Sequence, residues 1–484
     1  MKTSLAVGSI LLFNLALGSG DITNLFKVKR PVPTGPPRNV SEIYMSYFSQ
    51  KLDHFHDDDT TMWNQRYFVS TENFDATNRN VVFLMLGGEE EIDSNWMMYG
   101  QWVVSSRKYG ALLMYLEHRF YGQSQPLPDV SIESLRYLSS EQALGDATEF
   151  IKSMNQVYNL APDAKWIVFG GSYSGALAAW LRLKQPDLVY GAVCSSGPLL
   201  AELDFSDYHQ VVIDDLTASS EQCMTSLTTA LTQVEDLLAN PKQAEGLTSI
   251  FNLCSPIEGL ERNDIRVSNF FRTLLTPFSN AAQYSGQVKI SIDDLCGIMT
   301  YEAAGKEIQR LANVKALVDG MECVNYDYMS YVYALKDTVR KAGDVRQWFY
   351  QTCNEFGWFQ TSSRADLQFG LGVPIGYYTQ LCSDVFGEGY TEDAMKAVVD
   401  QTNLDYGGLG IENTASNVVY IYGSADPWHK VGITESDNPN ITVLYVEGMS
   451  HCQDMTEATR PETAQLTAAK KETDRMIGVW LGYN

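Results

Sequence analysis

The chain has 484 residues, of which 45% are hydrophobic and 19% charged, a composition typical of globular rather than disordered proteins. Its 35 basic and 59 acidic residues give a net charge of -24, which argues against nucleic acid or an anionic membrane as a partner, because both are negatively charged. The length allows a large buried core and more than one domain.

The first 20 residues have the pattern of a secretory signal peptide. Lys2 precedes the apolar stretch LAVGSILLFNLALG, and small residues follow it. A membrane anchor is the alternative, but the stretch is shorter than the roughly 20 apolar residues of a spanning helix and contains Asn14. We therefore expect an exported protein, secreted or lysosomal, without a membrane segment. Residues 21–40 are rich in proline and basic residues and predict a flexible leader.

Export agrees with the cysteines and the glycosylation motifs. The even number of cysteines, eight, suggests disulfides whose connectivity spacing alone cannot assign. Because no C-x-x-C pair occurs, we expect no structural zinc site. Asn39 and Asn440 each begin an N-x-S/T motif and are predicted to be glycosylated. The stretch KLDHFHDDD, with His54 and His56, is interpreted as a solvated loop rather than a metal site.

Predicted strands and helices alternate through the first half of the chain and again near its end. Strands are predicted at 66–70, 80–88, from 111 onward, 165–169, 188–196, 417–423 and 440–448, and helices at 139–159 and 172–183. Ser139 and Gln142 have the spacing of a capping box at the start of the first helix. Such alternation predicts an α/β protein with a mostly parallel sheet and helices on both faces.

From about residue 201 to 400 the pattern is helical. The helix predicted within 219–241 has one apolar stripe, formed by Cys223, Leu227, Leu231, Val234 and Leu238. Six of the eight cysteines lie in this region, which we interpret as an inserted domain held by disulfides. The predicted organisation is a signal peptide at 1–20, a leader at 21–40, an α/β domain at 41–200 and 401–484, and a helical cap at 201–400.

The stretch VFGGSYSGALAAW, residues 168–180, predicts a strand, a sharp turn and a helix, as in a nucleophile elbow. Around Ser172, the residues two positions away are Gly170 and Ser174, and they are small, as close packing of strand and helix requires. Centring the motif on Ser174 instead would start the turn inside the helix. Ser172 is therefore the predicted nucleophile, and Ser174 the small residue that lets the turn close.

A serine hydroxyl needs a base and an acid that orients the base. In the α/β-hydrolase order of serine, acid and histidine, the last two follow late strands. Asp426 follows the strand at 417–423 and His451 follows the strand at 440–448, so they are the predicted acid and base. Asp454 is a rival acid that we expect to cap the following segment. His429 is a rival base, too close to Asp426 to be oriented by it from a separate loop.

The tetrahedral intermediate requires two backbone N–H donors. We predict one from Tyr173, the residue after the nucleophile, and the other from Gly87 or Gly88 after an early strand, with Gly88 as the chosen residue. Glu89, Glu90 and Glu91 follow directly; they could hold a substrate amino terminus, with Glu89 as the chosen residue, or their side chains could face solvent.

Eight sequence blocks resemble, in combination, the exported serine peptidases that include lysosomal Pro-Xaa carboxypeptidase, dipeptidyl peptidase II and thymus-specific serine protease. The blocks are QKLDHF, WNQRYFV, LGGEEEI, EHRFYGQS, LSSEQAL, GGSYSGALAAW, YGSADPW and SHCQDM. The resemblance, from about residue 48 to 480, implies an α/β-hydrolase domain with a disulfide-linked helical cap and a triad at Ser172, Asp426 and His451. It also implies three disulfides and two remaining cysteines, paired or free: Cys223–Cys296, Cys254–Cys323 and Cys353–Cys382, with Cys194 and Cys452 left over.

The resemblance also bears on substrate choice. Proline-directed members carry a tryptophan after the acid that lines the proline pocket, and Trp428 matches it; an aromatic wall packs well on a flat ring. Those members usually have HHxDxR at the histidine, where this chain has HCQDMT, and often a bulkier residue in place of Ala176. These departures favour the thymus-specific serine protease branch.

We predict a serine exopeptidase, a carboxypeptidase or a dipeptidyl peptidase, that cleaves short peptides through an acyl-enzyme, with proline as a candidate cleavage residue. It needs no cofactor or metal, and a homodimer is an open alternative to a monomer. An esterase or lipase on the same fold and a catalytically silent binding protein are the alternative functions. The sequence leaves open which substrate terminus is held, because a carboxypeptidase needs a cationic anchor and an aminopeptidase an anionic one.

Overall fold

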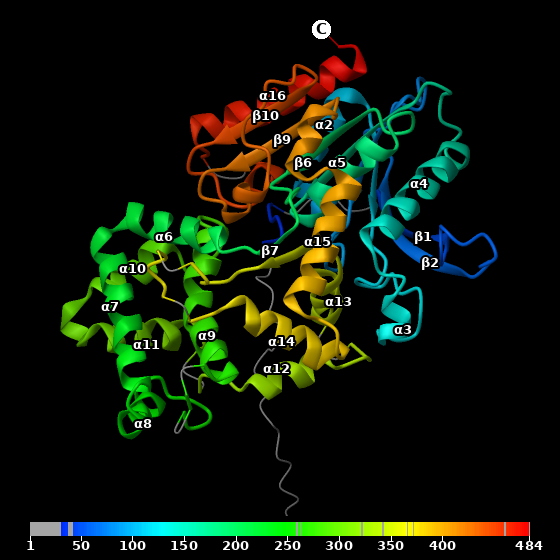
Figure 1. The fold of residues 1–484 in the computed structure, drawn as a ribbon. Coiled ribbons are helices and arrows are strands. Elements are labelled where there is room, and N and C mark those ends of the chain that lie inside the picture. Colours follow the sequence, from blue (N-terminus) through cyan, green and yellow to red (C-terminus); the bar gives the residue numbers. More distant parts are fainter. Residues whose placement is uncertain are drawn as a thin grey trace, which may run out of the picture.

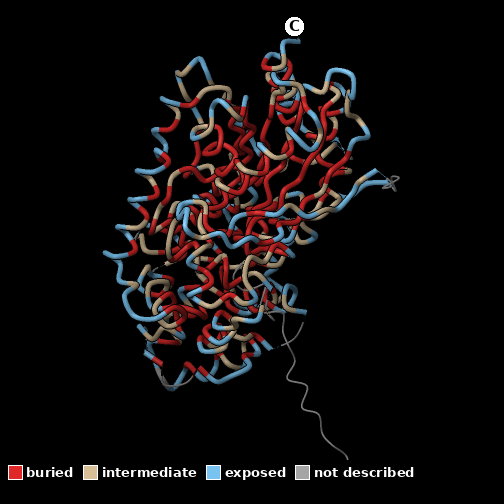
Figure 2. Tube along the Cα trace, turned by 90° about the vertical axis from the view of Figure 1, so that its right-hand side faces the viewer, coloured by how far each residue is buried: buried red, intermediate tan, exposed pale blue. Residues whose placement is uncertain are grey.

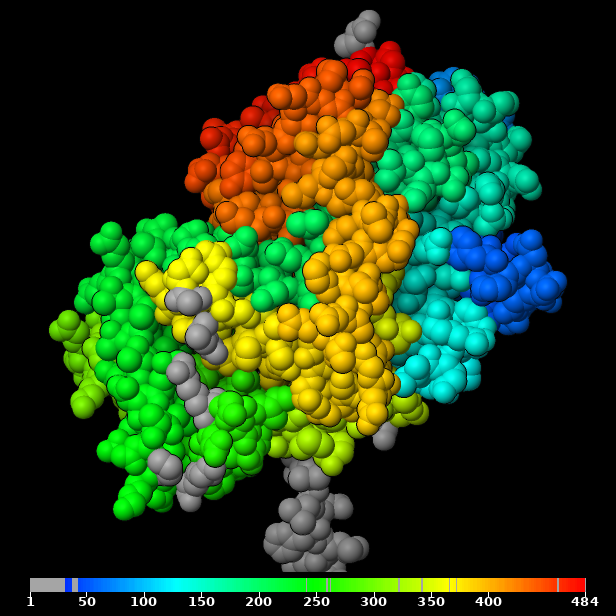
Figure 3. Space-filling view, in the orientation of Figure 1, coloured from blue at the N-terminus to red at the C-terminus, as the bar shows by residue number. Residues whose placement is uncertain are grey.

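The computed structural model describes residues 31–36, 42–257, 260–261, 263–320, 323–340, 343–364, 366–370, 372–458 and 461–483. The predicted signal peptide, most of the predicted leader and Asn39 lie outside these residues. Figure 1 shows one part built around a sheet and another built mainly from helices. The space-filling view in Figure 3 shows the green-to-yellow helical part packed directly against the sheet-containing part.

The sheet has eight strands in the order β1-β2-β4-β3-β5-β6-β9-β10. Their bounds are β1 (Ile43–Lys51), β2 (Met62–Ser70), β3 (Val81–Leu86), β4 (Leu112–Leu116), β5 (Lys165–Gly171), β6 (Gly191–Ser195), β9 (Val418–Gly423) and β10 (Ile441–Val446). Strand β2 pairs antiparallel with β1 and β4, and the remaining pairs are parallel. This mostly parallel order is the α/β-hydrolase fold, which confirms the predicted fold class.

Two hydrophobic cores lie on opposite faces of this sheet, because successive strand residues point to opposite sides. Val82 and Leu84 of β3 pack with helices α4 (Ser140–Val157) and α5 (Tyr173–Lys184). Val81 and Phe83 of the same strand pack with α2 (Gln101–Tyr109) and α16 (Ala464–Leu481). Figure 2 shows the buried segments gathered in the interior of the molecule and the exposed segments along its outline. Strand β1 and helices α2 and α16 are additions to the elements predicted from the sequence.

The insertion between β6 and β9 contains most of the remaining helices. They are α6 (Asp207–Ser219), α7 (Glu221–Leu238), α8 (Pro241–Ile250), α9 (Ile265–Gln283), α10 (Ile292–Thr300), α11 (Glu307–Val318), α12 (Tyr328–Leu335), α13 (Val345–Gln351), α14 (Ile375–Phe386) and α15 (Glu392–Tyr406). The short helices α1 (Trp96–Tyr99) and α3 (Ile132–Leu135) belong to the α/β part. The insertion also holds a two-stranded parallel sheet of β7 (Glu202–Asp204) and β8 (Gly357–Phe359), so it is not wholly helical.

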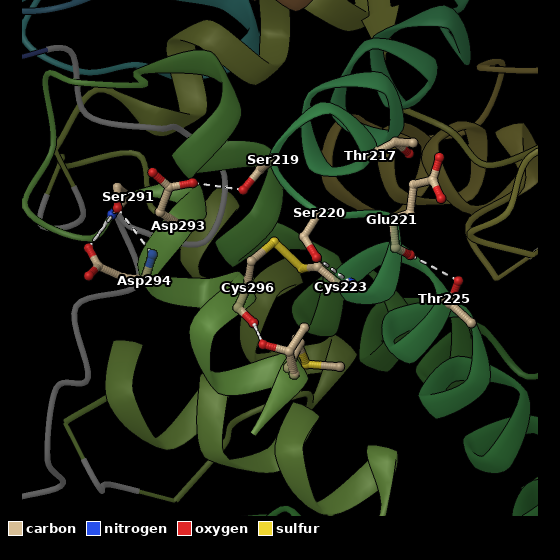
Figure 4. The surroundings of a disulfide bond; sticks show 12 residues. Thr217, Ser219, Ser220, Glu221, Cys223, Thr225, Ser291, Asp293, Asp294 and Cys296 are labelled. Atoms are coloured by element: carbon tan, nitrogen blue, oxygen red, sulfur yellow. Dashed lines mark hydrogen bonds between the residues drawn. A yellow bond between two sulfur atoms is a disulfide. The ribbon is translucent and has the colours of Figure 1, made fainter. Parts of the chain in front are cut away.

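Three disulfides join segments of the insertion, and they are the pairs that the family resemblance implies. They are Cys223–Cys296, Cys254–Cys323 and Cys353–Cys382. The first connects α7 to α10, and Figure 4 shows both helix starts beside it. There the Ser220 hydroxyl accepts a hydrogen bond from the Cys223 N–H, and Ser291 and Asp294 form a capping box. The two remaining cysteines, Cys194 and Cys452, are buried and free.

The start of α4 differs from the predicted capping box. The Ser139 hydroxyl accepts the Gln142 N–H at 3.1 Å, which is one half of the box. The Gln142 side chain instead donates to Asp53 at 2.8 Å and accepts the backbone N–H of His54 at 3.0 Å. The predicted box is therefore only half formed, because a distant loop binds the glutamine.

The loop with the two histidines is only partly solvated. The His54 side chain is 6% exposed and contacts the Asp146 carboxylate at 2.8 Å, so the interpretation as a solvated loop is wrong for this residue. The His56 side chain is 78% exposed. Asn440 is exposed directly before β10, and its glycosylation stays a prediction. In the part of the chain that the structure describes, no helix has the length and apolar character needed to cross a membrane.

Candidate active site

Ser172 lies in a strained turn between β5 and α5. Its backbone has φ 58° and ψ -135°, in a region that non-glycine residues rarely adopt. A Cβ at Gly170 would lie 1.9 Å from the Ser174 carbonyl oxygen, and one at Gly175 would lie 2.9 Å from the Ser195 carbonyl oxygen. Strand and helix therefore touch at these glycines, and the turn has the geometry that the motif predicts.

The two serines of the turn have different environments. The Ser174 hydroxyl donates to the Gly171 carbonyl at 2.9 Å and accepts the Gly171 N–H at 3.1 Å, so it braces the turn. Ser172 instead lines a cavity between the α/β part and the insertion. This geometry favours Ser172 over Ser174 as the candidate nucleophile.

Asp426 and His451 form a buried pair at the ends of neighbouring parallel strands. The Nδ1 of His451 lies 2.9 and 3.0 Å from the two carboxylate oxygens of Asp426, and both side chains are wholly buried. The backbone N–H of His451 donates to the Gln283 carbonyl of α9 at 2.9 Å, so the insertion also holds this loop. The Nε2 of His451 is buried and has no hydrogen-bond partner among the described residues. This is the nitrogen that would accept a serine proton.

The charge of Asp426 affects the protonation of this histidine. Burial by itself lowers the pKa of His451, but the adjacent carboxylate more than offsets burial and raises this pKa above the ordinary 6.5. Asp426 thus stabilises the imidazolium that forms when the neutral His451 ring accepts a proton.

The rival residues have other contacts. Asp454 accepts a hydrogen bond from the Ser195 hydroxyl of β6, so the prediction that it caps the following segment is wrong. Burial raises the pKa of Asp454 to about 6. The Nδ1 of His429 lies 2.7 Å from the Asp426 backbone carbonyl, within the 3-10 helix Pro427–Val431, and not against its carboxylate.

The loop after β3 passes against the first turn of α5. The Gly87 N–H donates to the Leu116 carbonyl at 2.7 Å and thus belongs to the sheet. At Gly88 a Cβ would lie 3.6 Å from the Ser174 Cβ. The first N–H groups of a helix lack acceptors within the helix, and Tyr173 is the first residue of α5. Gly88 and Tyr173 are therefore the candidate oxyanion donors.

The Tyr173 side chain connects the α/β part to the insertion. Its hydroxyl lies 3.0 Å from the Nε2 of His118 and accepts the side-chain N–H of Gln351, at the end of α13, at 3.1 Å. The Nδ1 of His118 lies 2.8 Å from the Arg119 carbonyl and donates to it, so Nε2 accepts the tyrosine proton. Nothing local in the sequence signals this contact.

The cavity at Ser172 has walls from both parts of the molecule. Residues outside the insertion contribute Glu89, Ser172 and Trp428. The insertion contributes His209, Arg272, Leu275, Thr276, Ser279, Gln283, Tyr284, Val345, Trp348, Phe349, Thr352, Trp358, Phe359, Gln360, Tyr377, Tyr378 and Leu381. Most of the wall is thus supplied by the insertion, where the sequence predicts no catalytic or substrate-binding residue.

Aromatic rings form the wall nearest to the candidate base. The Trp428 ring lies 6.1 Å from the His451 ring and 5.8 Å from the Trp358 ring. Trp358 has φ 57°, a strained conformation of the kind that often marks functional sites. Trp428 is predicted from the sequence, but Trp358 and Trp348 are not; the only local signal for Trp358 is the glycine before it. Ala176 is wholly buried and is not among the lining residues, so its effect on the cavity can only be indirect.

Comparison with known proteins identifies the family of this chain. The family model described as serine carboxypeptidase S28 matches residues 50–473. A Caenorhabditis elegans protein provisionally named as a serine protease is 35% identical over 92% of this chain and 90% of its own. Mouse thymus-specific serine protease is 32% identical over 90% of this chain and 87% of its own. Human lysosomal Pro-X carboxypeptidase is 25% identical over 93% of this chain and 90% of its own. The chain therefore belongs to the S28 family of serine peptidases.

Proposed function

We propose that this serine peptidase is an exopeptidase for short peptides, with Ser172 as nucleophile, His451 as base and Asp426 as the acid that orients it. The observation that carries the proposal is the position of Ser172 in a cavity whose walls come mostly from the insertion. Such walls restrict access to the ends of peptides and exclude folded chains.

In the proposed reaction, His451 removes the hydroxyl proton as Ser172 attacks the scissile carbonyl. The N–H groups of Tyr173 and Gly88 stabilise the oxyanion, and Asp426 stabilises the imidazolium that forms. Collapse of the intermediate transfers the proton to the leaving amine and leaves an acyl-enzyme on Ser172. Water, activated by His451, then hydrolyses this ester and regenerates the hydroxyl.

Glu89 supports recognition of a substrate amino terminus. It is 8% exposed, follows the candidate oxyanion donor Gly88, and lines the cavity together with Ser172. A carboxylate at this position could pair with the ammonium group of a peptide that extends one or two residues from the scissile carbonyl. This arrangement favours dipeptidyl peptidase over carboxypeptidase polarity.

The aromatic wall supports proline next to the scissile bond. Trp428 and Trp358 cross at nearly a right angle, 87°, and both line the cavity. Flat aromatic faces pack well on the rigid pyrrolidine ring. Human lysosomal Pro-X carboxypeptidase has a name that describes proline-directed cleavage.

The test is hydrolysis of Xaa-Pro-Yaa peptides by the purified protein, with and without N-acetylation, beside Pro-Xaa peptides and short acyl esters. We expect cleavage after proline and a loss of at least about tenfold in kcat/KM on acetylation, the equivalent of 1.4 kcal/mol. Glu89→Gln should remove this difference, and Glu90→Gln, the matched control, should keep it. Ester turnover without peptide cleavage would reject the peptidase proposal in favour of an esterase, and preference for acetylated peptides would reverse the polarity.

We also propose that the protein is exported, secreted or lysosomal, and glycosylated at Asn440. Three disulfides support folding in an oxidising compartment, and Asn440 is exposed. Expression in cultured animal cells, with and without Asn440→Gln, tests both points. We expect the protein in the medium or in lysosomes, with a glycosidase-sensitive mass that decreases in the variant; a reduced cytosolic protein would contradict the proposal.

A further inference from the structure

One face of helix α9 forms a continuous side of the cavity. Its lining residues are Arg272, Leu275, Thr276, Ser279 and Gln283. Apart from the adjacent Leu275 and Thr276, successive members are three or four residues apart, which places them on one side of the helix. Because Arg272 and Gln283 are eleven positions apart (283 - 272), the cavity follows α9 for three turns.

The C-terminal end of α9 is held at the candidate base. The His451 N–H donates to the Gln283 carbonyl at 2.9 Å, and the Tyr284 ring lies 5.8 Å from the His451 ring. A rise of 1.5 Å per residue places Arg272 about 16 Å from this point along the helix. Helical side chains lean toward the N-terminus, so the guanidinium lies at the far end of the cavity from the reaction centre.

The charged residues of the cavity lie at separate places. Among the lining residues, Glu89 carries a carboxylate and Arg272 a guanidinium, while burial lowers the pKa of His209 to about 4 and keeps this ring neutral. Glu89 lies near the reaction centre, because it directly follows Gly88 and Gly88 packs on Ser174. Arg272 belongs to the other end, so the cavity is negative near the nucleophile and positive far from it.

Aromatic and amide groups hold the Arg272 guanidinium in a fixed orientation. The guanidinium lies over the Tyr331 ring at 4.7 Å, and its Nε donates to the Asn269 amide oxygen at 3.4 Å. The Tyr377 hydroxyl donates to the same amide oxygen at 2.6 Å and thereby holds it. A fixed, planar guanidinium at the end of a cavity is well suited to bind a carboxylate through two hydrogen bonds.

We propose that Arg272 binds the C-terminal carboxylate of the peptide substrate, four or five residues beyond the scissile bond, and that the enzyme thereby selects substrates by length. An extended chain spans about 3.3 Å per residue, so about 16 Å corresponds to four or five residues. The carboxylate of a single leaving residue is too close to the scissile bond to reach this site. The inference rests on the proposed function, in which Ser172 cleaves peptides within this cavity.

The first test needs only the wild-type protein. Peptides with one cleavable bond and one to seven residues on the leaving side are compared as free acids and as C-terminal amides. We expect the acid to have a kcat/KM at least about tenfold higher at four or five leaving residues, through KM, and equal values at one or two. Equal values for acid and amide at every length would overturn the proposal.

The second test locates the effect. Arg272→Gln should abolish the difference between acid and amide at four or five leaving residues, because KM for the acids should rise to the value for the amides. The matched control is Arg266→Gln, on the same helix, because this arginine is half exposed and paired with Asp264. A difference that persists in Arg272→Gln would overturn the assignment to this residue.

Labelling with a fluorophosphonate probe separates the two proposals and checks the fold of each variant. If Ser172 is labelled and peptides are cleaved without regard to their C-terminus, only the carboxylate site is rejected. If no peptide is cleaved at all, the proposed function and the carboxylate site both fail.

Discussion

The α/β part and the insertion achieve their order by different means. In the α/β part, hydrogen-bonded strands carry two cores, and its two described cysteines, Cys194 and Cys452, are free. The insertion is built from helices whose packing is reinforced by three disulfides. The candidate triad comes from strand ends of the first, and most of the cavity wall comes from the second. A hydrogen-bonded sheet positions a few reacting atoms accurately. The helices of an insertion can differ between relatives without disturbing that sheet, and such differences change which substrate the cavity accepts.

The largest loss of activity should follow replacement of the candidate nucleophile. This variant tests whether the reacting groups come from the α/β part. Ser172→Ala should lower kcat by at least about ten-thousandfold, because loss of a triad serine removes the covalent path. The control Ser174→Ala loses only the hydrogen bonds to Gly171 and should lower kcat by less than about tenfold. Hydrolysis rates and fluorophosphonate labelling measure both. Wild-type labelling of Ser172→Ala would exclude this serine as the nucleophile.

A second contrast uses one glycine from each part. A methyl group at Gly170 would meet the Ser174 carbonyl at 1.9 Å, so Gly170→Ala should distort the turn, abolish activity and destabilise the fold by about 3 kcal/mol. A methyl group at Gly246 in α8 would meet no neighbouring atom of the described residues within 4 Å, so Gly246→Ala should stabilise by about 0.5 kcal/mol. Urea unfolding and peptide hydrolysis measure the two variants. An active, stable Gly170→Ala variant would contradict the proposed elbow.

Removal of a disulfide should affect the insertion more than the reaction centre. Replacing both Cys223 and Cys296 with serine opens a link between residues 73 apart and should cost about 2–5 kcal/mol of stability. Peptide hydrolysis should then fall more than fluorophosphonate labelling, because the insertion supplies the peptide-binding walls. Cys194→Ala in β6 is the control and should affect both readouts alike. Equal losses of hydrolysis and labelling in the double variant would mean that the insertion supports the reaction centre as much as it supports peptide binding.

The smallest expected effect is a pH dependence of stability. Burial, with a contribution from Asp214, raises the pKa of Asp215 to about 8, and burial raises that of Glu202 to about 7. Between their ordinary and raised pKa values these carboxyls bind protons only in the folded protein, so stability should rise as pH falls through 8. The raised pKa of His451 acts in the same direction above pH 6.5.

The measurement is thermal unfolding at pH 8.5 and 6.5. We expect a wild-type Tm roughly 2–4 °C higher at pH 6.5, and a smaller difference in Asp215→Asn. Below pH 6.5 the rise should flatten, because burial lowers the pKa of His118 and of His209 to about 4, and the protons that these histidines bind in the unfolded chain offset those that Asp215 and Glu202 bind in the folded protein. An unchanged difference in Asp215→Asn would show that another group causes it.

Much of the α/β part is predictable because its signals are local. Fully buried strands such as β3 and β9 have continuous apolar runs, and the elbow requires small residues at fixed positions. Strand β1 is not predicted in this way, because most of its residues are partly or fully exposed and it has no continuous apolar run. The capping box predicted at Ser139 is only half formed, since the competing partner of Gln142 comes from a loop 89 residues away.

By itself, the sequence determined the alternation of strands and helices in most of the α/β part, the presence of a disulfide-rich insertion and the three residues now proposed as a triad. Each of these depends on patterns within a few residues, or on the fixed order of a sheet. Only the tertiary structure decided that α9 presents Arg272 to the cavity, that Trp358 meets Trp428, and that the His54 side chain contacts Asp146. These contacts join segments far apart in the chain, and they depend on which face of each helix packs inward, which no local pattern specifies.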